Sequence, residues 1–105
     1  MDSPIQAPDF SSLSLKELRH INLLHGTLNF VKAAKLAGIT QSALSQSIAN
    51  VEQRLGIELF KRTRRSVSST VYAESIAERA TEIINSLNDL NLHVDALRGV
   101  REGKV

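Results

Sequence analysis

Four cationic side chains lie within five residues near the middle of the chain, and such a cluster can bind phosphate groups. No aspartate or glutamate lies among them to balance their charge. Arginine also enters narrow DNA minor grooves, so phosphate contact or minor-groove insertion is the predicted chemistry. An ordinary solvated surface would carry the same charges. The cluster consists of Lys61, Arg62, Arg64 and Arg65.

A set of small polar side chains precedes this cluster. Glutamine can hydrogen-bond adenine through both a donor and an acceptor, and serine hydroxyls can contact base edges. The same residue types are common on solvated helix faces, so their place in the fold must decide between the two interpretations. The predicted base contacts are Gln41, Ser42, Ser45 and Gln46, and the predicted backbone contacts beside them are Thr40 and Asn50.

The sequence shows no pattern of residues for other site chemistry. It contains no cysteine, which excludes disulfides and thiolate metal sites. His20, His25 and His93 lack the spacing of a zinc site and are predicted to be surface residues. A Ser/His/Asp arrangement, a phosphate-binding glycine-rich loop and an acid/base pair are all missing. We therefore expect no metal, no cofactor within these residues and no enzyme activity.

Composition favours a helical protein that does not enter membranes. Hydrophobic residues make up 42% of the 105 residues and aromatic residues only 4%, so the core must consist mainly of leucine, isoleucine, valine and alanine. No apolar run approaches the roughly 20 residues that span a bilayer, and the N-terminus lacks the pattern of a signal peptide. The net charge of +2 says little about nucleic acid. We expect a cytoplasmic location.

The first element that must position these side chains is a helix predicted over residues 15–25. Ser14 and Glu17 form a capping-box pattern, in which each side chain can bind the backbone N–H of the other residue. Leucine and isoleucine then recur at helical spacing until residues 26–27 interrupt the pattern. Residues 1–13, with two prolines, are predicted to be a loosely ordered lead-in.

A helix, a tight turn and another helix are predicted between residues 29 and 55. Asn29 can cap the first of these helices, and Gly38 can end it because glycine tolerates the positive φ of a sharp turn. Thr40 can cap the second, whose apolar stripe leaves the serines and glutamines on the other side. A helix braced in this way fits the major groove of DNA, which is about 12 Å wide. The apolar stripe consists of Leu44, Ile48, Val51 and Leu55.

A short two-stranded hairpin, which we call the wing, is predicted over residues 57–69. Apolar residues flank a basic centre rich in serine and threonine, which suits a hairpin better than a helix. The cationic cluster would then lie on the wing, beside the candidate recognition helix.

A long helix is predicted from Thr70 to Leu97. Its apolar positions alternate three and four residues apart, which is typical of a coiled-coil seam that buries itself against a partner helix. Glycines at positions 99 and 103 predict a flexible hinge over residues 98–105. The predicted dimer seam consists of Ala73, Ile76, Ala80, Ile83, Leu87, Leu90, Val94 and Leu97.

Several short motifs occur in a characteristic order and spacing over about residues 14–97. They are Ala33-Ala34, Thr40-Gln41-Ser42-Ala43-Leu44-Ser45, Ile48, Glu52, Leu55-Gly56 and Leu59-Phe60-Lys61-Arg62. This order resembles the signature of LysR-type transcriptional regulators. The resemblance implies a winged helix-turn-helix over residues 14–69 and a linker helix over residues 70–97 that dimerises. It also implies that Gln41, Ser42, Ser45, Gln46 and Arg62 approach DNA.

The sequence departs from that family's usual pattern at several positions. Ser42 stands where proline is usual and Gln46 where arginine is frequent, which changes the expected base preference. Ala37, Ser69 and Ala73 also differ from the usual residues and concern packing. Members of the family continue into a larger domain that binds a small-molecule effector. The resemblance therefore implies that this chain is an excised DNA-binding fragment whose effector binds outside it, the alternative being a naturally short protein.

Three functions remain in competition. The first is a homodimer that binds double-stranded DNA at two-fold related half-sites. A dimeric helical protein-interaction module would use only the seam and would not explain the cationic cluster. A winged-helix regulator of another family would share the helix-turn-helix but not the order of the motifs.

Overall fold

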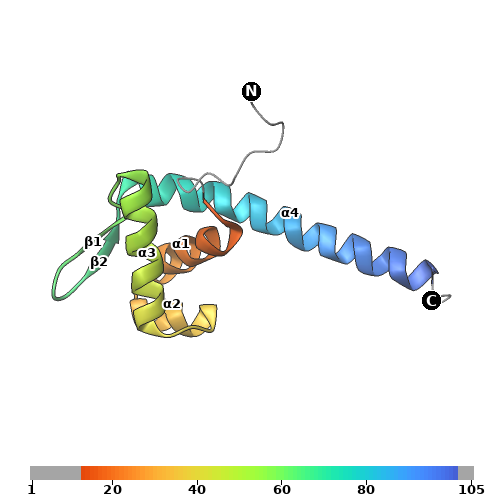
Figure 1. Cartoon of the computed structure of the whole chain (residues 1–105), viewed down its shortest axis with the longest axis horizontal. Helices are drawn as coiled ribbons and strands as arrows, with labels where there is room; N and C mark the ends of the chain where they lie inside the picture. The colour runs from red at the N-terminus through yellow and green to blue at the C-terminus, as the bar shows by residue number, and fades with distance from the viewer. Residues whose placement is uncertain (1–12, 102–105) are drawn as a thin grey trace, which may run out of the picture.

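Residues 13–101 of the chain fold into three short helices, a two-stranded hairpin and one long helix (Figure 1). The computed structural model describes residues 13–101. The predicted fold class, a mainly helical winged helix-turn-helix followed by a long helix, is confirmed. The elements are α1 (Leu15–Thr27), α2 (Phe30–Ala37), α3 (Gln41–Leu55), β1 (Phe60–Arg62), β2 (Val67–Ser69) and α4 (Val71–Arg101).

The caps predicted for the three short helices are present. The Ser14 hydroxyl accepts from the Glu17 N–H at 3.1 Å, while the Glu17 carboxylate accepts from the Ser14 N–H at 3.0 Å. Asn29 caps α2 and Thr40 caps α3 through their side-chain oxygens. Gly38 ends α2 with a φ of 72°, a conformation that costs other residues a Cβ clash. The boundaries of α2 and α3 are therefore encoded locally.

The first helix ends two residues later than predicted, at Thr27. The hydroxyl of Thr27 donates to the carbonyl of Leu23 at 3.0 Å and keeps the last turn helical. Leu28 then ends the helix with a φ of 51°, and its N–H bonds to the carbonyl of Leu24 at 2.7 Å. The left-handed conformation costs a leucine about 1–2 kcal/mol, so leucine is not a residue type from which a helix end is predicted. The end of α1 therefore could not be read from the sequence.

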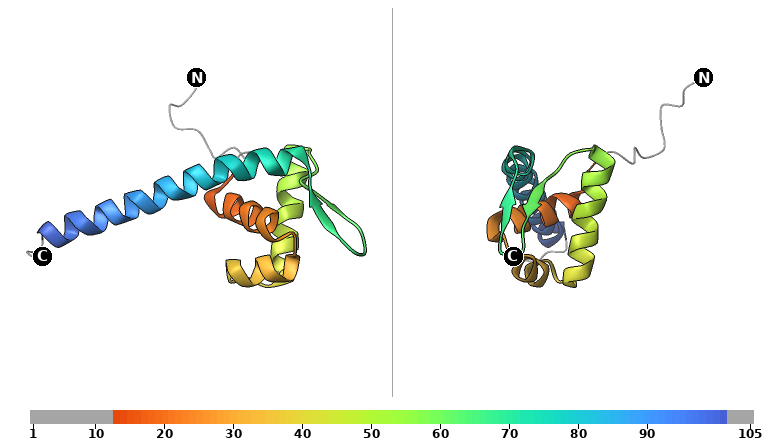
Figure 2. Two further views of the ribbon diagram at one scale, coloured as in Figure 1. Left: turned by 180° about the vertical axis from the view of Figure 1, so that it is seen from behind. Right: turned by 90° about the vertical axis from the view of Figure 1, so that its left-hand side faces the viewer.

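Helix α1 is the centre of the domain, because it contacts α2, α3 and α4 (Figure 2). Its Ile21 and Leu24 are fully buried together with Leu44, Ile48 and Val51 of α3. Burying each aliphatic side chain of this size contributes about 1.5–3 kcal/mol. The predicted apolar stripe of α3 is thus confirmed at these three positions, and it fixes the rotation of α3 about its axis.

An ion pair joins the start of α1 to the end of α3. Arg54 Nη2 donates to Glu17 Oε1 at 2.6 Å, and both side chains are largely buried. Burial raises the pKa of Glu17, but hydrogen bonds from Ser14 and Arg54 outweigh it and leave that pKa below its usual value. The carboxylate that caps α1 therefore also holds α3 in place.

The prediction that the three histidines are surface residues is wrong for His20. This side chain is 5% exposed, and its Nδ1 shares a 2.7 Å hydrogen bond with the Ser47 hydroxyl of α3. Burial lowers the pKa of His20, and the charges of Lys16 and Arg19 lower it further. His20 is thus a neutral structural link between α1 and α3. The sequence could not show this, because the two partners are 27 residues apart.

His25 is also structural, whereas His93 is exposed as predicted. The Nδ1 of His25 shares a 2.7 Å hydrogen bond with the hydroxyl of Ser69, the last residue of β2. This bond connects the end of α1 to the base of the wing.

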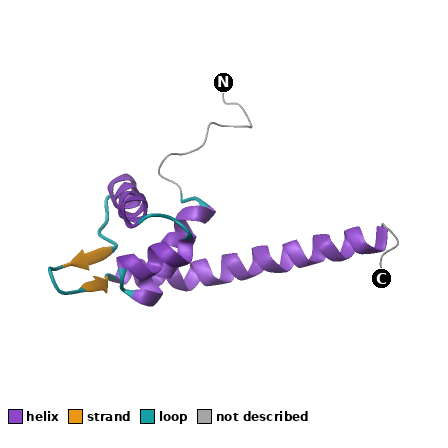
Figure 3. Cartoon of the chain, turned by 90° about the horizontal axis from the view of Figure 1, so that it is seen from below, coloured by secondary structure: helices purple, strands orange, loops and turns teal. Residues whose placement is uncertain are grey.

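The long helix α4 has two different halves, which corrects the predicted dimer seam. Ala73 and Ala80 are fully buried within the chain itself and are therefore unavailable to a partner. Ile76 is half-buried and packs against the same core. Thr81 still bonds to Asn22 of α1, and Ile84 and Leu87 share a groove with Leu15. The C-terminal part of the helix then extends away from the domain as a single rod (Figure 3). Neither α4 nor any other helix among the described residues is long and apolar enough to cross a membrane.

The predictions for the two chain ends are only partly testable. Leu13, assigned to the loose lead-in, packs against the core. Helix α4 continues to Arg101, so the first four residues of the predicted flexible hinge at 98–105 are helical. Gly99 does not stop the helix, since an internal glycine costs only about 1 kcal/mol. The rest of both predictions, residues 1–12 and 102–105, lies outside the described residues.

We expect acid to destabilise the fold through Glu17. Its pKa is lowered by folding, so its contribution is present at neutral pH and is lost as the pH falls through the folded-state pKa. Glu17→Gln should lower the free energy of unfolding by about 1–2 kcal/mol at neutral pH. It should also flatten the decline in stability between about pH 5 and pH 3 in urea unfolding followed by circular dichroism.

The exposed Glu82 on α4 supplies the control, because Glu82→Gln should leave the pH profile as in the wild type. An identical pH profile for Glu17→Gln and the wild type would show that the ion pair contributes no pH-dependent stability.

Candidate nucleic-acid interface

Helix α3 presents polar side chains in three directions. A helix turns about 100° per residue, so burial of the apolar stripe leaves Ser42 and Gln46 pointing directly away from the core. Both are exposed. Gln41 and Ser45 lie on the side of the wing, and Asn50 lies on the side of α1. The four predicted base-contacting residues therefore share one continuous outer surface, at the N-terminal half of α3.

Thr40 and Gln41 lie at the start of that surface. The hydroxyl of Thr40 accepts from the Ala43 N–H at 3.0 Å, so its first role is to cap the helix. Thr40 is nevertheless exposed, and an exposed hydroxyl that accepts one hydrogen bond can still donate another. The cap and a phosphate contact are therefore compatible at this residue.

A tight turn sets the tip of the wing. Strands β1 and β2 pair antiparallel with Arg62 opposite Val67. Between them the Thr63 N–H bonds to the Ser66 carbonyl at 2.9 Å, and the Thr63 hydroxyl accepts from the Ser66 N–H at 3.1 Å. Arg64 and Arg65 occupy the two central positions of this turn and are both exposed. The hydrogen bonds within the turn thus place two guanidinium groups at the tip.

The carboxylate of Glu52 attaches the wing to α3. Its Oε2 accepts from the N–H groups of Leu59, at 2.8 Å, and Phe60, at 3.3 Å. Glu52 occurs among the family motifs, but the sequence predicts no role for it. No sequence signal marks the role, because an acid on a polar helix side looks the same whether it faces water or a backbone amide.

A groove of about 240 Å³ lies between the wing and the start of the two helices of the helix-turn-helix. Its lining brings Gln41 of α3 together with Arg64 and Arg65 of the wing tip. Asn29 and Phe30, at the start of α2, form its other wall. A predicted base-contacting residue and two predicted phosphate-contacting residues thus meet at one site, although they are more than 20 residues apart.

The other two cations of the cluster lie on opposite faces of the hairpin. Side chains alternate along a strand, so Arg62 shares the face of the buried Phe60 while Lys61 points the other way. The guanidinium carbon of Arg62 lies 4.5 Å from the centre of the Phe30 ring. The structure therefore groups Arg62, Arg64 and Arg65 near α2 and α3 and separates Lys61 from them.

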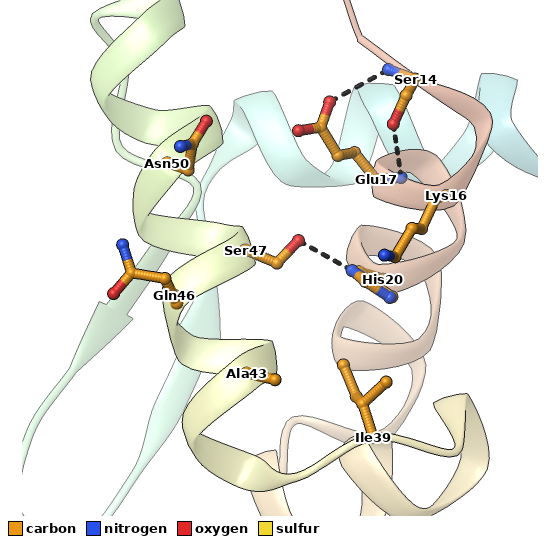
Figure 4. A pocket seen from close by; sticks show the side chains of 9 residues that line it. All are labelled: Ser14, Lys16, Glu17, His20, Ile39, Ala43, Gln46, Ser47 and Asn50. Carbon is orange, nitrogen blue, oxygen red and sulfur yellow. Dashed lines mark hydrogen bonds between the residues drawn. The ribbon is translucent and has the colours of Figure 1, made fainter.

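A cleft of about 400 Å³ borders α3 on the side away from the wing (Figure 4). Gln46 and Asn50 of α3 line one wall, and Lys16 of α1 lines the other. Lys16 was not among the predicted contacts, because nothing in its spacing shows that the start of α1 lies beside α3. A cation thus lies on each side of the polar surface of α3.

Other site chemistry finds no support in the part of the chain that the structure describes. Among residues 13–101, no three histidine or acidic side chains gather in a way that could hold a metal ion. The titratable pair with the shortest contact, Glu17 and Arg54, is engaged in holding two helices together. The polar surface of α3 and the cations on both sides of it form the candidate site.

Comparison with curated proteins finds relatives that regulate transcription. The HTH-type transcriptional regulator IlvR of Caulobacter vibrioides is 35% identical over 92 residues, which are 88% of this chain and 30% of IlvR. The HTH-type transcriptional regulator BudR of Klebsiella aerogenes is 35% identical over 91 residues, which are 87% of this chain and 62% of BudR. The chain thus spans less than two thirds of the length of both relatives.

Solved structures include similar folds bound to DNA. The BenM DBD in complex with catB site 1 DNA superposes with a TM-score of 0.76 at 27% identity, over 82% of this chain and 96% of that one. Vibrio fischeri DarR in complex with DNA superposes with a TM-score of 0.73 at 25% identity, over 85% of this chain and 30% of that one.

The family itself follows from a match that covers more than half of the chain. Residues 15–74 match the model of the bacterial regulatory helix-turn-helix proteins of the lysR family. This span contains α1, the helix-turn-helix, the wing and the start of α4. The resemblance noted in the sequence is therefore confirmed, and the chain belongs to the lysR family of bacterial regulatory helix-turn-helix proteins.

Proposed function

We propose that this chain binds double-stranded DNA sequence-specifically, as the DNA-binding part of a homodimeric transcription regulator. One observation carries the proposal: the polar surface of α3 lies directly beside a wing tipped with two exposed arginines. The BenM DBD and DarR, which share the fold, are described in complex with DNA. A regulatory, non-enzymatic role agrees with the relatives IlvR and BudR.

In this proposal α3 lies in the major groove with its N-terminal half toward the bases. Ser42 and Gln46 point outward and would reach base edges first, while Gln41 and Ser45 would reach bases on the wing side. Glutamine can pair with adenine through two hydrogen bonds, and each good pair of this kind discriminates against the wrong base by about 1–3 kcal/mol.

Phosphates on both sides of the groove would meet cations. Arg62, Arg64 and Arg65 would contact the backbone or minor groove on the wing side, and Lys61 would reach it only from the outer face of the hairpin. Lys16 and Asn50 would contact the backbone on the side of α1, and Thr40 would do so at the start of α3. Contacts of this kind position the protein and make its affinity depend on salt.

A second copy would cover the free half of α4. Leu90 and Val94 are 54% and 45% exposed, and with Ile83, Leu87 and Leu97 they form one continuous apolar stripe. Where this stripe meets the domain, an open groove of about 390 Å³ is lined by Leu15, Ile84 and Leu87. Two antiparallel copies of α4 would cover both features and present two α3 helices to two half-sites.

The location in the cell and the effector belong to the same proposal. A regulator that binds the chromosome acts in the bacterial cytoplasm. A small-molecule effector would bind a separate domain outside this sequence, since the chain spans only 30% of the length of IlvR. Selection from random duplexes, followed by a gel shift at moderate salt, tests the proposal as a whole. Failure to retain any duplex at micromolar protein would favour the protein-interaction module instead.

We expect Gln46→Ala and Ser45→Ala each to weaken binding to the selected duplex by about 1–3 kcal/mol, with little effect on unrelated DNA. Fluorescence anisotropy with both duplexes measures the difference. Asn91→Ala, which removes an exposed amide from α4, is the control and should change neither affinity. Equal losses on both duplexes would mean that these side chains do not read bases.

We expect Arg64→Ala combined with Arg65→Ala to weaken binding to both duplexes similarly. The plot of log K against log salt should become less steep by about 0.9 for each lost phosphate contact, because fewer counterions are released. Lys16→Ala alone should make the slope less steep by about 0.9, the change expected for one lost phosphate contact. The double variant Lys35→Ala with Arg79→Ala removes two exposed cations elsewhere and is the charge-matched control. A slope unchanged by the wing substitutions would remove the wing from the phosphate contacts.

We expect Leu90→Asp combined with Val94→Asp to give a folded monomer in sedimentation velocity, because unpaired charges in an apolar interface lose solvation. Both positions lie beyond the domain, so the helix-turn-helix should remain intact. Apparent affinity for a two-half-site duplex should fall by roughly 10²-fold or more as the linked second site is lost. Asn85→Asp with Ala96→Asp, on the opposite side of α4, should remain dimeric. A monomeric wild type at micromolar concentration would refute the dimer.

A further inference from the structure

We propose that Phe30 is a positioning residue of the DNA interface, which holds the guanidinium group of Arg62 at a defined place between the wing and the helix-turn-helix. The inference rests on the proposed DNA binding and adds a residue that neither the sequence nor the comparisons assign to it. Phe30 touches no base or phosphate in this proposal. It acts through Arg62.

The Phe30 ring is itself held in place. Phe30 is the first residue of α2, directly after the Asn29 cap, and it packs half-buried against the core. A ring at such a position has one face against the domain and can offer the other to a neighbour. The anchoring of Phe30 therefore gives Arg62 a rigid surface to lie on.

The contact has the geometry of a cation–π interaction. The guanidinium carbon of Arg62 lies 4.5 Å from the ring centre, well inside the roughly 6 Å over which the ring attracts a cation. Arg62 ends β1 on the same face as the buried Phe60, so its side chain starts toward the domain and reaches Phe30 across the gap to α2. Within residues 13–101, no carboxylate pairs with Arg62 in an ion pair.

The contact with Phe30 fixes the position of Arg62, the third arginine of the wing, relative to Arg64 and Arg65. Arg64 and Arg65 line the groove beside Gln41, and Phe30 forms part of the same lining. Without the ring, the long and exposed Arg62 side chain would sample many rotamers and would be repelled by the two neighbouring arginines. With the ring, the guanidinium group of Arg62 is held against Phe30, which is one wall of the groove that Arg64 and Arg65 line. Arg62 itself does not line the groove, so a phosphate at the Phe30 edge of the groove would meet its guanidinium group already in position.

A double-mutant cycle with the full chain tests the proposal, using the duplex obtained by selection. Phe30→Leu, which keeps an apolar side chain but removes the ring, should weaken binding roughly three- to tenfold. Phe30→Tyr, which keeps the ring, should bind within about twofold of the wild type. In a background of Arg62→Ala, Phe30→Leu should cause no further loss, because the residue through which Phe30 acts is already gone.

Nuclear magnetic resonance distinguishes this role from simple packing, because a Phe30 side chain that only filled space would not shift the Arg62 signal. The Arg62 side-chain N–H signal should be shifted by the ring current in the wild type and in Phe30→Tyr, and the shift should vanish in Phe30→Leu. Thermal unfolding of each variant shows whether leucine destabilises the domain. If it does, Phe30→Met, with its more adaptable side chain, replaces Phe30→Leu in the cycle.

Two results would overturn the inference: an equal loss from Phe30→Leu in both backgrounds, or no loss and no change of the Arg62 signal. Either result leaves the proposed function intact as long as the wild type retains the selected duplex. If the wild type retains no duplex, the proposed function itself fails, and the nuclear magnetic resonance signal alone then reports whether the ring holds Arg62.

Discussion

The burial of Leu44, Ile48 and Val51 against α1 is the interaction on which the rest of the structure depends. These three side chains fix the rotation of α3, and the rotation decides which polar side chains face solvent. A rotation by one residue, about 100°, would turn Gln46 toward α1 or the wing and remove it from the outer surface. The Arg54–Glu17 ion pair and the His20–Ser47 hydrogen bond maintain the same rotation through polar contacts. The buried side of α3, which faces the core, therefore determines which residues of the opposite side form the candidate interface.

The wing depends on links to the domain, since a hairpin with three residues in each strand is marginal by itself. Glu52 binds two backbone amides at its base, and His25 binds Ser69 at the end of β2. The hydroxyl of Thr70 donates to the carbonyls of Glu58, at 2.6 Å, and Leu59, at 3.0 Å, and closes the base from the other side. The position of the wing arginines thus depends on hydrogen bonds at the base of the wing, made by residues that lie away from the candidate interface.

Helix α4 carries two neighbouring apolar stripes: one packs against the domain, and the other is available to the proposed partner. Ala73, Ala77 and Ala80 are small enough for α4 to approach the domain closely, and they are buried there. The stripe from Ile83 to Leu97 runs at a different angle around the axis, and its side chains are exposed except for the half-buried Leu87. Because one rigid helix carries both stripes, the angle between them would set how each DNA-binding domain is oriented relative to its partner. The sequence does not show this division of α4. Its apolar residues are spaced three and four apart throughout, and this spacing predicts a helix but not which partner each turn contacts.

Local rules were enough to predict which elements this chain forms, although not where α1 ends. The Ser14–Glu17 capping box, the Asn29 and Thr40 caps and the glycine at position 38 act within about one helical turn, so they can be read directly from neighbouring residues. Helical periodicity predicted the buried stripe of α3, and through it the outer set that includes Ser42 and Gln46. Relations between distant residues could not be predicted in this way: the contacts of His20 with Ser47, of Glu52 with the wing and of Arg62 with Phe30, and the cleft that Lys16 shares with Asn50. Each of these depends on how helices cross and where the wing folds back, and those geometries arise only when the whole apolar core is buried together.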